Sequence, residues 1–160
     1  MAAAVSLKLG VTPPHFVPPG VKVRAATYQA LLQEYYFPRL LTCHQNEYFL
    51  FQEDNAPSHS AKTSRELLNA LCSEAGGQRL CWPAASPDLN PLDYGVWKAW
   101  DDAVGRAGVN TSLGLLRSRI LSANDELQKS DIVEKAIRSW PKRLKACVAA
   151  EGGAFEYSLA

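Results

Sequence analysis

The sequence has little net charge, no long hydrophobic run and no closely spaced cysteine pair. Seventeen Lys and Arg residues against sixteen Asp and Glu residues give the 160 residues a net charge of +1 at pH 7, which excludes a histone-like polycation. No stretch approaches the roughly 18 unbroken apolar residues of a membrane span, so we expect no membrane partner. The four cysteines lack a CxxC spacing, which favours reduced, mostly buried thiols over a zinc site or a disulfide framework.

The composition is that of a globular protein. Hydrophobic residues make up 47% of the chain and charged residues 21%, a balance that can build a core and that excludes disordered and collagen-like classes. The length is close to the roughly 150 residues of one domain. The first ten residues lack the positively charged start of a secretory signal, so we expect an intracellular protein.

Turn residues and apolar runs predict four short strands. The segments 5–8 and 15–17 are separated by Gly10 and a Pro-Pro pair, and they predict a hairpin. The aromatic-rich run 48–51 predicts a central strand covered on both faces, and residues 79–82 predict a fourth strand.

Apolar residues at steps of three and four predict helices between and after these strands. The first covers 28–36 and ends before Pro38, the second has Ser60 as its N-cap and ends at Gly76-Gly77, and the third starts at Asn90-Pro91 and runs to about residue 104. Two more cover 113–127 and 132–144, and Pro141 should kink or split the last. Trp82, Trp97 and Trp100 could stack on bases, but tryptophans spaced along a helix are more often core residues, and we predict core positions for them. Alternating strands and helices predict an α/β fold with a helical C-terminal tail.

Two acidic residues occupy positions from which they can meet at one sheet edge. Asp54 follows the predicted central strand, at the carboxyl end where open α/β sheets place their sites. Side chains alternate along a strand, so Glu53 points to the opposite face and only one of the two acids can serve this site. Asp93 takes the third position of the next predicted helix. Paired carboxylates supply the hard oxygen ligands that Mg²⁺ requires.

Each candidate also has an ordinary structural explanation. An acid in the first turn of a helix, such as Asp93, interacts favourably with the helix dipole. An Asp just after a strand, such as Asp54, forms Asx-turns. His59 can approach a phosphate or be satisfied by local backbone, and no role is assigned to it.

Two motifs carry a family resemblance. The segments FQEDNAPSHSAK (51–62) and WPAASPDLNPLDYGVW (82–97) closely resemble the second and third catalytic blocks of the mariner/Tc superfamily of transposases. The flanking sequence is similar too, from VSLKLG at residue 5 to EGGAFE at 151–156, so nearly the whole chain is covered. By this resemblance Asp54 matches the second metal-binding aspartate and Asp93 the third acid, with thirty-eight residues between them.

The resemblance implies a fold and a chemistry. It implies an RNase H-like mixed sheet flanked by helices, with residues 1–104 as a partial DDE/D transposase domain and 105–160 as its C-terminal helical extension. It implies metal-dependent DNA cleavage and strand transfer, with Asp54 and Asp93 as catalytic ligands of Mg²⁺ or Mn²⁺. The implied partners are DNA and either a second copy or a full-length transposase, and the implied location is the nucleus.

The family's first catalytic aspartate has no counterpart in this sequence. Family members place it on a central strand that precedes residues 1–9, and the first carboxylate here is Glu34. We therefore expect an N-terminally truncated domain that lacks the first, central strand and is catalytically incomplete. Each metal ion would keep about one protein carboxylate, too few to fix an in-line geometry. The strands that flank the missing one would pair directly or receive a partner's strand.

Basic residues gather near the C-terminus. Between residues 129 and 145, six basic residues accompany two acidic ones. The predicted DNA contacts are Lys135, Arg138, Lys142, Arg143 and Lys145, and a solvated helix face is the alternative. Three hypotheses stand: a transposase-derived DNA-processing domain, a non-catalytic nucleic-acid-binding or protein-interaction module retained from a transposable element, and a chain without function.

Overall fold

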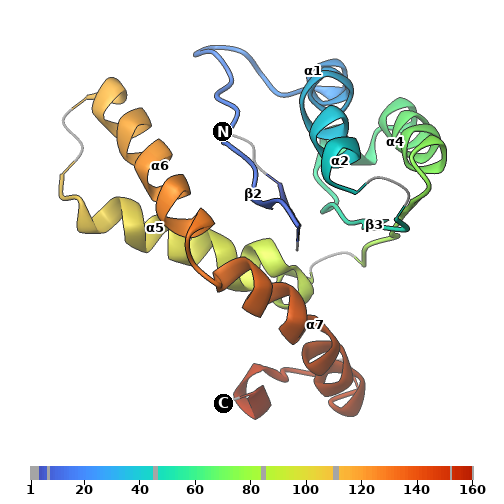
Figure 1. The fold of residues 1–160 in the computed structure, drawn as a ribbon. Coiled ribbons are helices and arrows are strands. Elements are labelled where there is room, and N and C mark those ends of the chain that lie inside the picture. The colour runs from blue at the N-terminus through green and yellow to red at the C-terminus, as the bar shows by residue number, and fades with distance from the viewer. Residues whose placement is uncertain are drawn as a thin grey trace. The chain divides into compact units, whose positions relative to one another are not determined.

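The chain folds into two compact units. A computed structural model describes residues 4–6, 8–44, 47–83, 86–109, 112–151 and 153–159 (Figure 1). Unit 1 combines the segments Met1–His15 and Ser86–Ala160, and unit 2 is formed by Phe16–Ala85. Unit 1 thus brings together two segments that are distant in sequence, and unit 2 is inserted between them along the chain.

A short hairpin opens unit 1. β1 (Val5–Ser6) pairs antiparallel with β2 (Gly10–Val11), and the Thr12 amide donates to the Ala4 carbonyl oxygen at 2.8 Å. The predicted hairpin is confirmed, but placing its second strand at 15–17 is wrong. Gly10 adopts a φ of +64°, a left-handed conformation that glycine takes without strain, and the chain therefore turns back earlier than the Pro-Pro pair suggests.

Three long helices form the body of unit 1. They are α5 (Trp97–Arg106), α6 (Leu113–Gln128) and α7 (Ile132–Ala149). A helical run leads into α5 from Pro91 through a π-helical turn at Leu92–Val96. α6 packs against α5, and β2 packs against α6 (Figure 1). Short 3₁₀ helices lie at Pro87–Leu89 and Glu156–Leu159.

The core of unit 1 lies where these helices meet the hairpin. Its buried side chains are Val11, Val96, Trp100, Ala103, Ala123, Leu127, Val133 and Ala136. Trp100 is 2% exposed and its Nε1 donates to the Ile120 carbonyl oxygen at 3.2 Å, while Trp97 packs against the same cluster, so the core prediction is confirmed for these two. It is wrong for Trp82, which lies in unit 2 and is only partly buried. The helices predicted over 113–127 and 132–144 are also confirmed, and Pro141 lies inside α7 without splitting it.

Unit 2 begins with one long helical segment. α1 (Ala25–Ala30), a π-helical stretch (Leu31–Tyr36) and α2 (Phe37–Cys43) follow one another without a break. The prediction that the helix ends before Pro38 is therefore wrong. Proline lacks an N–H and crowds the carbonyl group four residues earlier, and the wider π-helical turns directly before Pro38 accommodate both effects.

A parallel strand pair and two helices complete unit 2. β3 (Leu50–Phe51) pairs in parallel with β4 (Gln78–Arg79), and the chain between them forms α3 (Pro57–Ser60) and α4 (Lys62–Glu74). The predicted strands are confirmed, although each is only two residues long. The expectation that the strand at 48–51 is covered on both faces is wrong, because Leu50 in β3 is 53% exposed.

The two ends of α4 differ in how closely they match the prediction. Ser60 does not cap α4, because it is the last residue of α3 and its hydroxyl donates to a backbone carbonyl oxygen upstream. At the other end, the amides of Gly76 and Gly77 donate to the carbonyl oxygens of Ser73 and Cys72 at 3.2 and 2.8 Å. Gly76 has a φ of +76°, so the helix ends in a Schellman motif, as the glycine pair predicts.

The predicted α/β class is confirmed, and the described residues are mostly helical. Within the described residues the strands form two separate two-stranded sheets, antiparallel in unit 1 and parallel in unit 2, and not one mixed sheet. The residue at which the C-terminal helical extension was predicted to start, 105, lies inside α5, which packs against α6 within unit 1.

Two further expectations concern cysteines and membranes. Of the four cysteines only Cys72 is fully buried, and Cys81 is exposed, so the expectation of mostly buried thiols is wrong. Among the described helices, none combines the length and the apolar character that crossing a membrane requires.

Candidate active site

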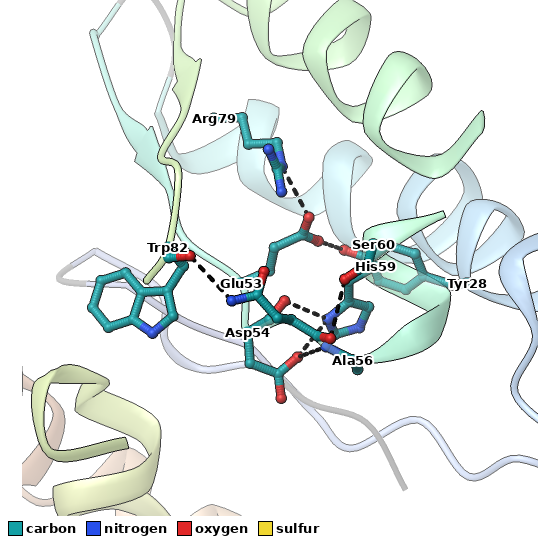
Figure 2. A network of polar contacts seen from close by, with 9 residues as sticks. Tyr28, Glu53, Asp54, Ala56, His59, Ser60, Arg79 and Trp82 are labelled. Carbon is teal, nitrogen blue, oxygen red and sulfur yellow. Dashed lines mark hydrogen bonds and ion pairs between the residues drawn. The ribbon is translucent and has the colours of Figure 1, made fainter. Parts of the chain in front are cut away.

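Asp54 lies just beyond β3, at the carboxyl end of the strand, as predicted. Its Oδ1 accepts a hydrogen bond from the Ala56 amide at 3.0 Å and lies 2.7 Å from His59 Nδ1 (Figure 2). The first of these bonds confirms that Asp54 forms an Asx-turn. The side chain is nevertheless 57% exposed, and its Oδ2 has no partner within the described part of the chain. Asp54 therefore closes a turn with one oxygen and leaves the other accessible.

Glu53 points to the opposite side of the chain and is only 7% exposed (Figure 2). Its Oε1 accepts a hydrogen bond from Arg79 Nε at 3.0 Å, and its Oε2 accepts a short one from the Tyr28 hydroxyl. Burial raises the pKa of Tyr28 well above its usual value, and the bond to Glu53 raises it further. Protein groups thus occupy both oxygens of Glu53, which confirms that only one of the two adjacent acids can serve an exposed site.

Sequence reasoning missed the residues that surround these acids. The His59 ring packs against the Tyr28 ring with 4.2 Å between centroids, which links the exposed Asp54 to the buried network. The turn after Asp54 is anchored by Asn55, whose Nδ2 donates to the Trp82 carbonyl oxygen at 3.0 Å. One signal was present: an arginine within a predicted strand, Arg79, needs an acceptor when it is buried.

Asp93 occupies the third position of a helix that begins at Pro91. Asn90 Oδ1 accepts a hydrogen bond from the Leu92 amide at 3.1 Å, and the Asn90 carbonyl oxygen accepts from the amides of Asp93 and Tyr94. The predicted Asn90 cap is therefore confirmed. The Asp93 side chain is exposed and lies within the π-helical turn, a local widening of the helix that is frequent at functional sites.

Asp54 belongs to unit 2 and Asp93 to unit 1, so their predicted meeting stays a prediction. Both are exposed carboxylates, the ligand type that suits Mg²⁺ and Mn²⁺. Within the residues that the structure describes, no three or more His, Cys, Asp or Glu side chains form a cluster that could hold a metal ion.

The predicted DNA contacts all lie on α7, but their surroundings differ. Lys135 and Arg138 form ion pairs at 2.8 and 2.7 Å with acids four residues earlier, which are Asp131, directly before α7, and Glu134 within it. Lys142 and Lys145 are exposed. Arg143 is mostly covered, with 18% of its side chain exposed, and contacts other groups of unit 1.

Known transposases are similar to this chain in sequence. No protein-family model matches it. The Tc1 transposase of Caenorhabditis elegans is 29% identical over 109 residues, which are 68% of this chain and 37% of that protein. The mariner Mos1 transposase of Drosophila mauritiana is 30% identical over 105 residues, which are 64% of this chain and 28% of that protein. The chain is homologous to the Tc1/mariner transposases.

Structures of the Mos1 transposase are similar over most of the chain. A Mos1 paired-end complex with the left transposon end gives a TM-score of 0.74 at 30% identity, over 93% of this chain and 42% of that one. The Mos1 catalytic domain with raltegravir and Mn gives 0.70 at 28% identity, over 93% of this chain and 74% of that one. The predicted Tc1/mariner relationship is thereby confirmed, and the chain spans 37% of the length of its Tc1 relative.

Proposed function

We propose that this chain is part of a transposase catalytic domain that acts on DNA by metal-dependent cleavage and strand transfer. Similarity to the Mos1 catalytic domain over 93% of the chain supports this reaction class and an RNase H-like arrangement. The observation that carries the site assignment is the contrast between two adjacent acids. Glu53 is buried against Arg79, whereas Asp54 is exposed at the carboxyl end of β3.

Asp54 and Asp93 are assigned as the carboxylate ligands of Mg²⁺ or Mn²⁺. The Mos1 catalytic domain has been solved with both Mg and Mn, which supports the choice of metal. Such ions, when bound, activate the attacking oxygen and stabilise the leaving oxygen of a phosphodiester. The contact between His59 and Asp54 Oδ1 orients the carboxylate and leaves Oδ2 for the ion. That Asp54 and Asp93 bind the ion together is inferred from the two sequence motifs that contain them.

The 160 residues supply two of the three acids of such a site. Asp54 is the first aspartate in the sequence, and Glu53, immediately before it, is engaged by Arg79 and Tyr28. We therefore propose that these residues alone bind divalent ions weakly and do not complete cleavage and strand transfer. Action in the nucleus and association with a second copy or a full-length transposase belong to the same proposal.

Metal-dependent nicking of labelled duplex DNA tests this function. The 160-residue chain and the product of the longest natural transcript are incubated with Mg²⁺ or Mn²⁺. Nicking by the longer product should be abolished by Asp54→Ala and by Asp93→Ala. The matched control is Asp102→Ala, which removes an exposed α5 acid that pairs with Lys98 at 3.7 Å. If the longest product does not nick the duplex, the proposed enzymatic function is wrong.

A second candidate function, DNA binding without catalysis, is favoured by one face of α7. Its exposed basic residues recur at three- and four-residue steps and are Lys135, Arg138, Lys142 and Lys145. Asp131 and Glu134 neutralise the first two, and Lys142 and Lys145 follow as exposed lysines on the same face. Lysine side chains on an exposed helix face bind DNA phosphates without reading base sequence.

Fluorescence anisotropy with a labelled duplex at several salt concentrations tests this second function. Two phosphate contacts predict that log K falls with log salt with a slope of about −1.8. Reversing both charges, with Lys142→Glu and Lys145→Glu, should remove this dependence. The same change at the exposed Lys22 in unit 2 is the control and should leave it in place. Affinity unchanged by salt and by the double reversal would defeat this function.

A further inference from the structure

Arg143 belongs to the predicted DNA contacts, but the structure gives its guanidinium three partners inside unit 1. Nη1 donates a hydrogen bond to the Asp88 carbonyl oxygen at 2.8 Å and lies 3.5 Å from Glu156 Oε1. Cζ lies 3.9 Å from the centre of the Tyr94 ring. These partners come from three segments that are separate in sequence: the 3₁₀ turn at Pro87–Leu89, the π-helical turn and the C-terminal 3₁₀ helix.

Tyr94 is held at its other end as well. Its hydroxyl donates to the Ala136 carbonyl oxygen on α7 at 2.6 Å. At Gly95, a Cβ atom would lie 3.0 Å from Ala136 Cβ, which shows how closely α7 approaches this helix start.

The partners of Arg143 flank the segment that carries Asp93. Asp88 precedes the Asn90 cap, and Tyr94 directly follows Asp93. We propose that Arg143 is a positioning residue that fixes the start of the Asp93 helix against α7. This inference rests on the proposed role of Asp93 as a metal ligand.

The chemistry of arginine suits this position and that of lysine does not. A guanidinium is planar, so it stacks on an aromatic ring while its N–H groups donate within the same plane. A lysine ammonium carries the same charge but cannot make both contacts in one fixed geometry. Arg143→Lys therefore separates loss of position from loss of charge. The matched control is Arg106→Lys, because Arg106 is exposed in the same unit and pairs only with Glu126 among the contacts described.

Amide hydrogen exchange of the 160-residue chain tests the positioning role without any metal. Arg143→Lys should speed exchange at the amides of Leu92 and Tyr94 about tenfold, the effect of losing one charge-assisted hydrogen bond. Exchange at Trp100, further along the same helical run, should stay within about twofold. Arg106→Lys should change neither. Unchanged exchange at Leu92 and Tyr94, or an equal rise throughout unit 1, would overturn the inference.

Paramagnetic broadening of NMR signals by Mn²⁺ tests the consequence for Asp93. Arg143→Lys should raise several-fold the Mn²⁺ concentration at which the Asp93 amide signal has lost half of its intensity. Arg106→Lys should leave that concentration unchanged. If Asp93→Asn abolishes broadening and Arg143→Lys leaves it unchanged, the positioning role is wrong while the proposed metal site stands. If Asp93→Asn does not change the broadening, Asp93 is not a metal ligand. In that case Arg143 cannot position a metal ligand, even if amide exchange shows that it fixes the start of the helix.

Discussion

Replacing Glu53 should destabilise unit 2 more than any surface substitution. Glu53→Gln keeps the size of the side chain but removes the negative charge that faces Arg79. The Arg79 side chain is only 12% exposed, so it would remain as a nearly buried cation without a counter-charge. Removing one partner of a buried ion pair costs about 3–5 kcal/mol. The amide oxygen of glutamine still accepts one hydrogen bond, so we expect a loss of about 2–3 kcal/mol.

Urea unfolding combined with amide exchange at Leu68 in α4 measures this loss within unit 2. The control is Glu66→Gln, which also removes a glutamate charge from this unit. Glu66 is 62% exposed and lies 3.8 Å from Lys62, so its replacement should cost less than about 0.5 kcal/mol. If Glu53→Gln costs no more than this control, the ion pair with Arg79 does not stabilise the unit and the argument for a buried network fails.

Three further predictions concern packing, backbone conformation and thiol chemistry. Leu68 is fully buried, so Leu68→Ala should lower the free energy of unfolding by about 2–5 kcal/mol in a urea titration, and a loss below about 1 kcal/mol would contradict its core position. Gly10→Ala would place a Cβ atom against Gln128 Oε1 at a φ of +64°, so it should cost about 1–3 kcal/mol in thermal unfolding, and an unchanged Tm would contradict this turn. Burial raises the pKa of Cys72 to about 11, so its thiol should stay protonated at pH 8 and react with a disulfide reagent far more slowly than the exposed Cys81; equal rates in the folded chain would refute this.

The features that local sequence determines were predictable. α6 and α7 follow from apolar residues at helical spacing, because the face that packs into a core repeats every three or four residues. The Asn90 cap and the glycine stop at Gly76 follow from backbone groups that only certain residues satisfy or tolerate. Each of these signals lies within a few residues of the structure that it predicts.

Failures occurred where the outcome depends on more distant contacts or on rarer backbone states. Pro38 was expected to end a helix, but the π-helical stretch before it lets the helix continue, and no simple composition signal marks such a stretch. The run 48–51 was expected to be buried because it is apolar, yet burial depends on what packs against a strand. Leu50 remains half exposed in a two-stranded sheet.

The candidate site shows the same division. The two-residue alternation of a strand was enough to predict that Glu53 and Asp54 point apart. It could not identify Tyr28 and Arg79 as partners of Glu53, because they lie 25 and 26 residues away along the chain. His59 is only five residues from Asp54, but a histidine that approaches a phosphate and one that is satisfied by local backbone both fit the sequence, and neither predicts its contact with the Asp54 carboxylate.

Charge counting on α7 overstates what the helix offers to DNA. Lys135 and Arg138 are already paired along the helix, and Arg143 is turned toward Asp88 and Tyr94. Reversing the charge at Arg143 would therefore disturb the start of the Asp93 helix, and weaker DNA binding by that variant would not reveal a phosphate contact. Reversal at Lys145, which is exposed, does not carry this ambiguity. An electrostatic DNA-binding role for α7 is therefore tested by the DNA affinity of variants with reversed charge at its exposed lysines, and not by the affinity of an Arg143 variant.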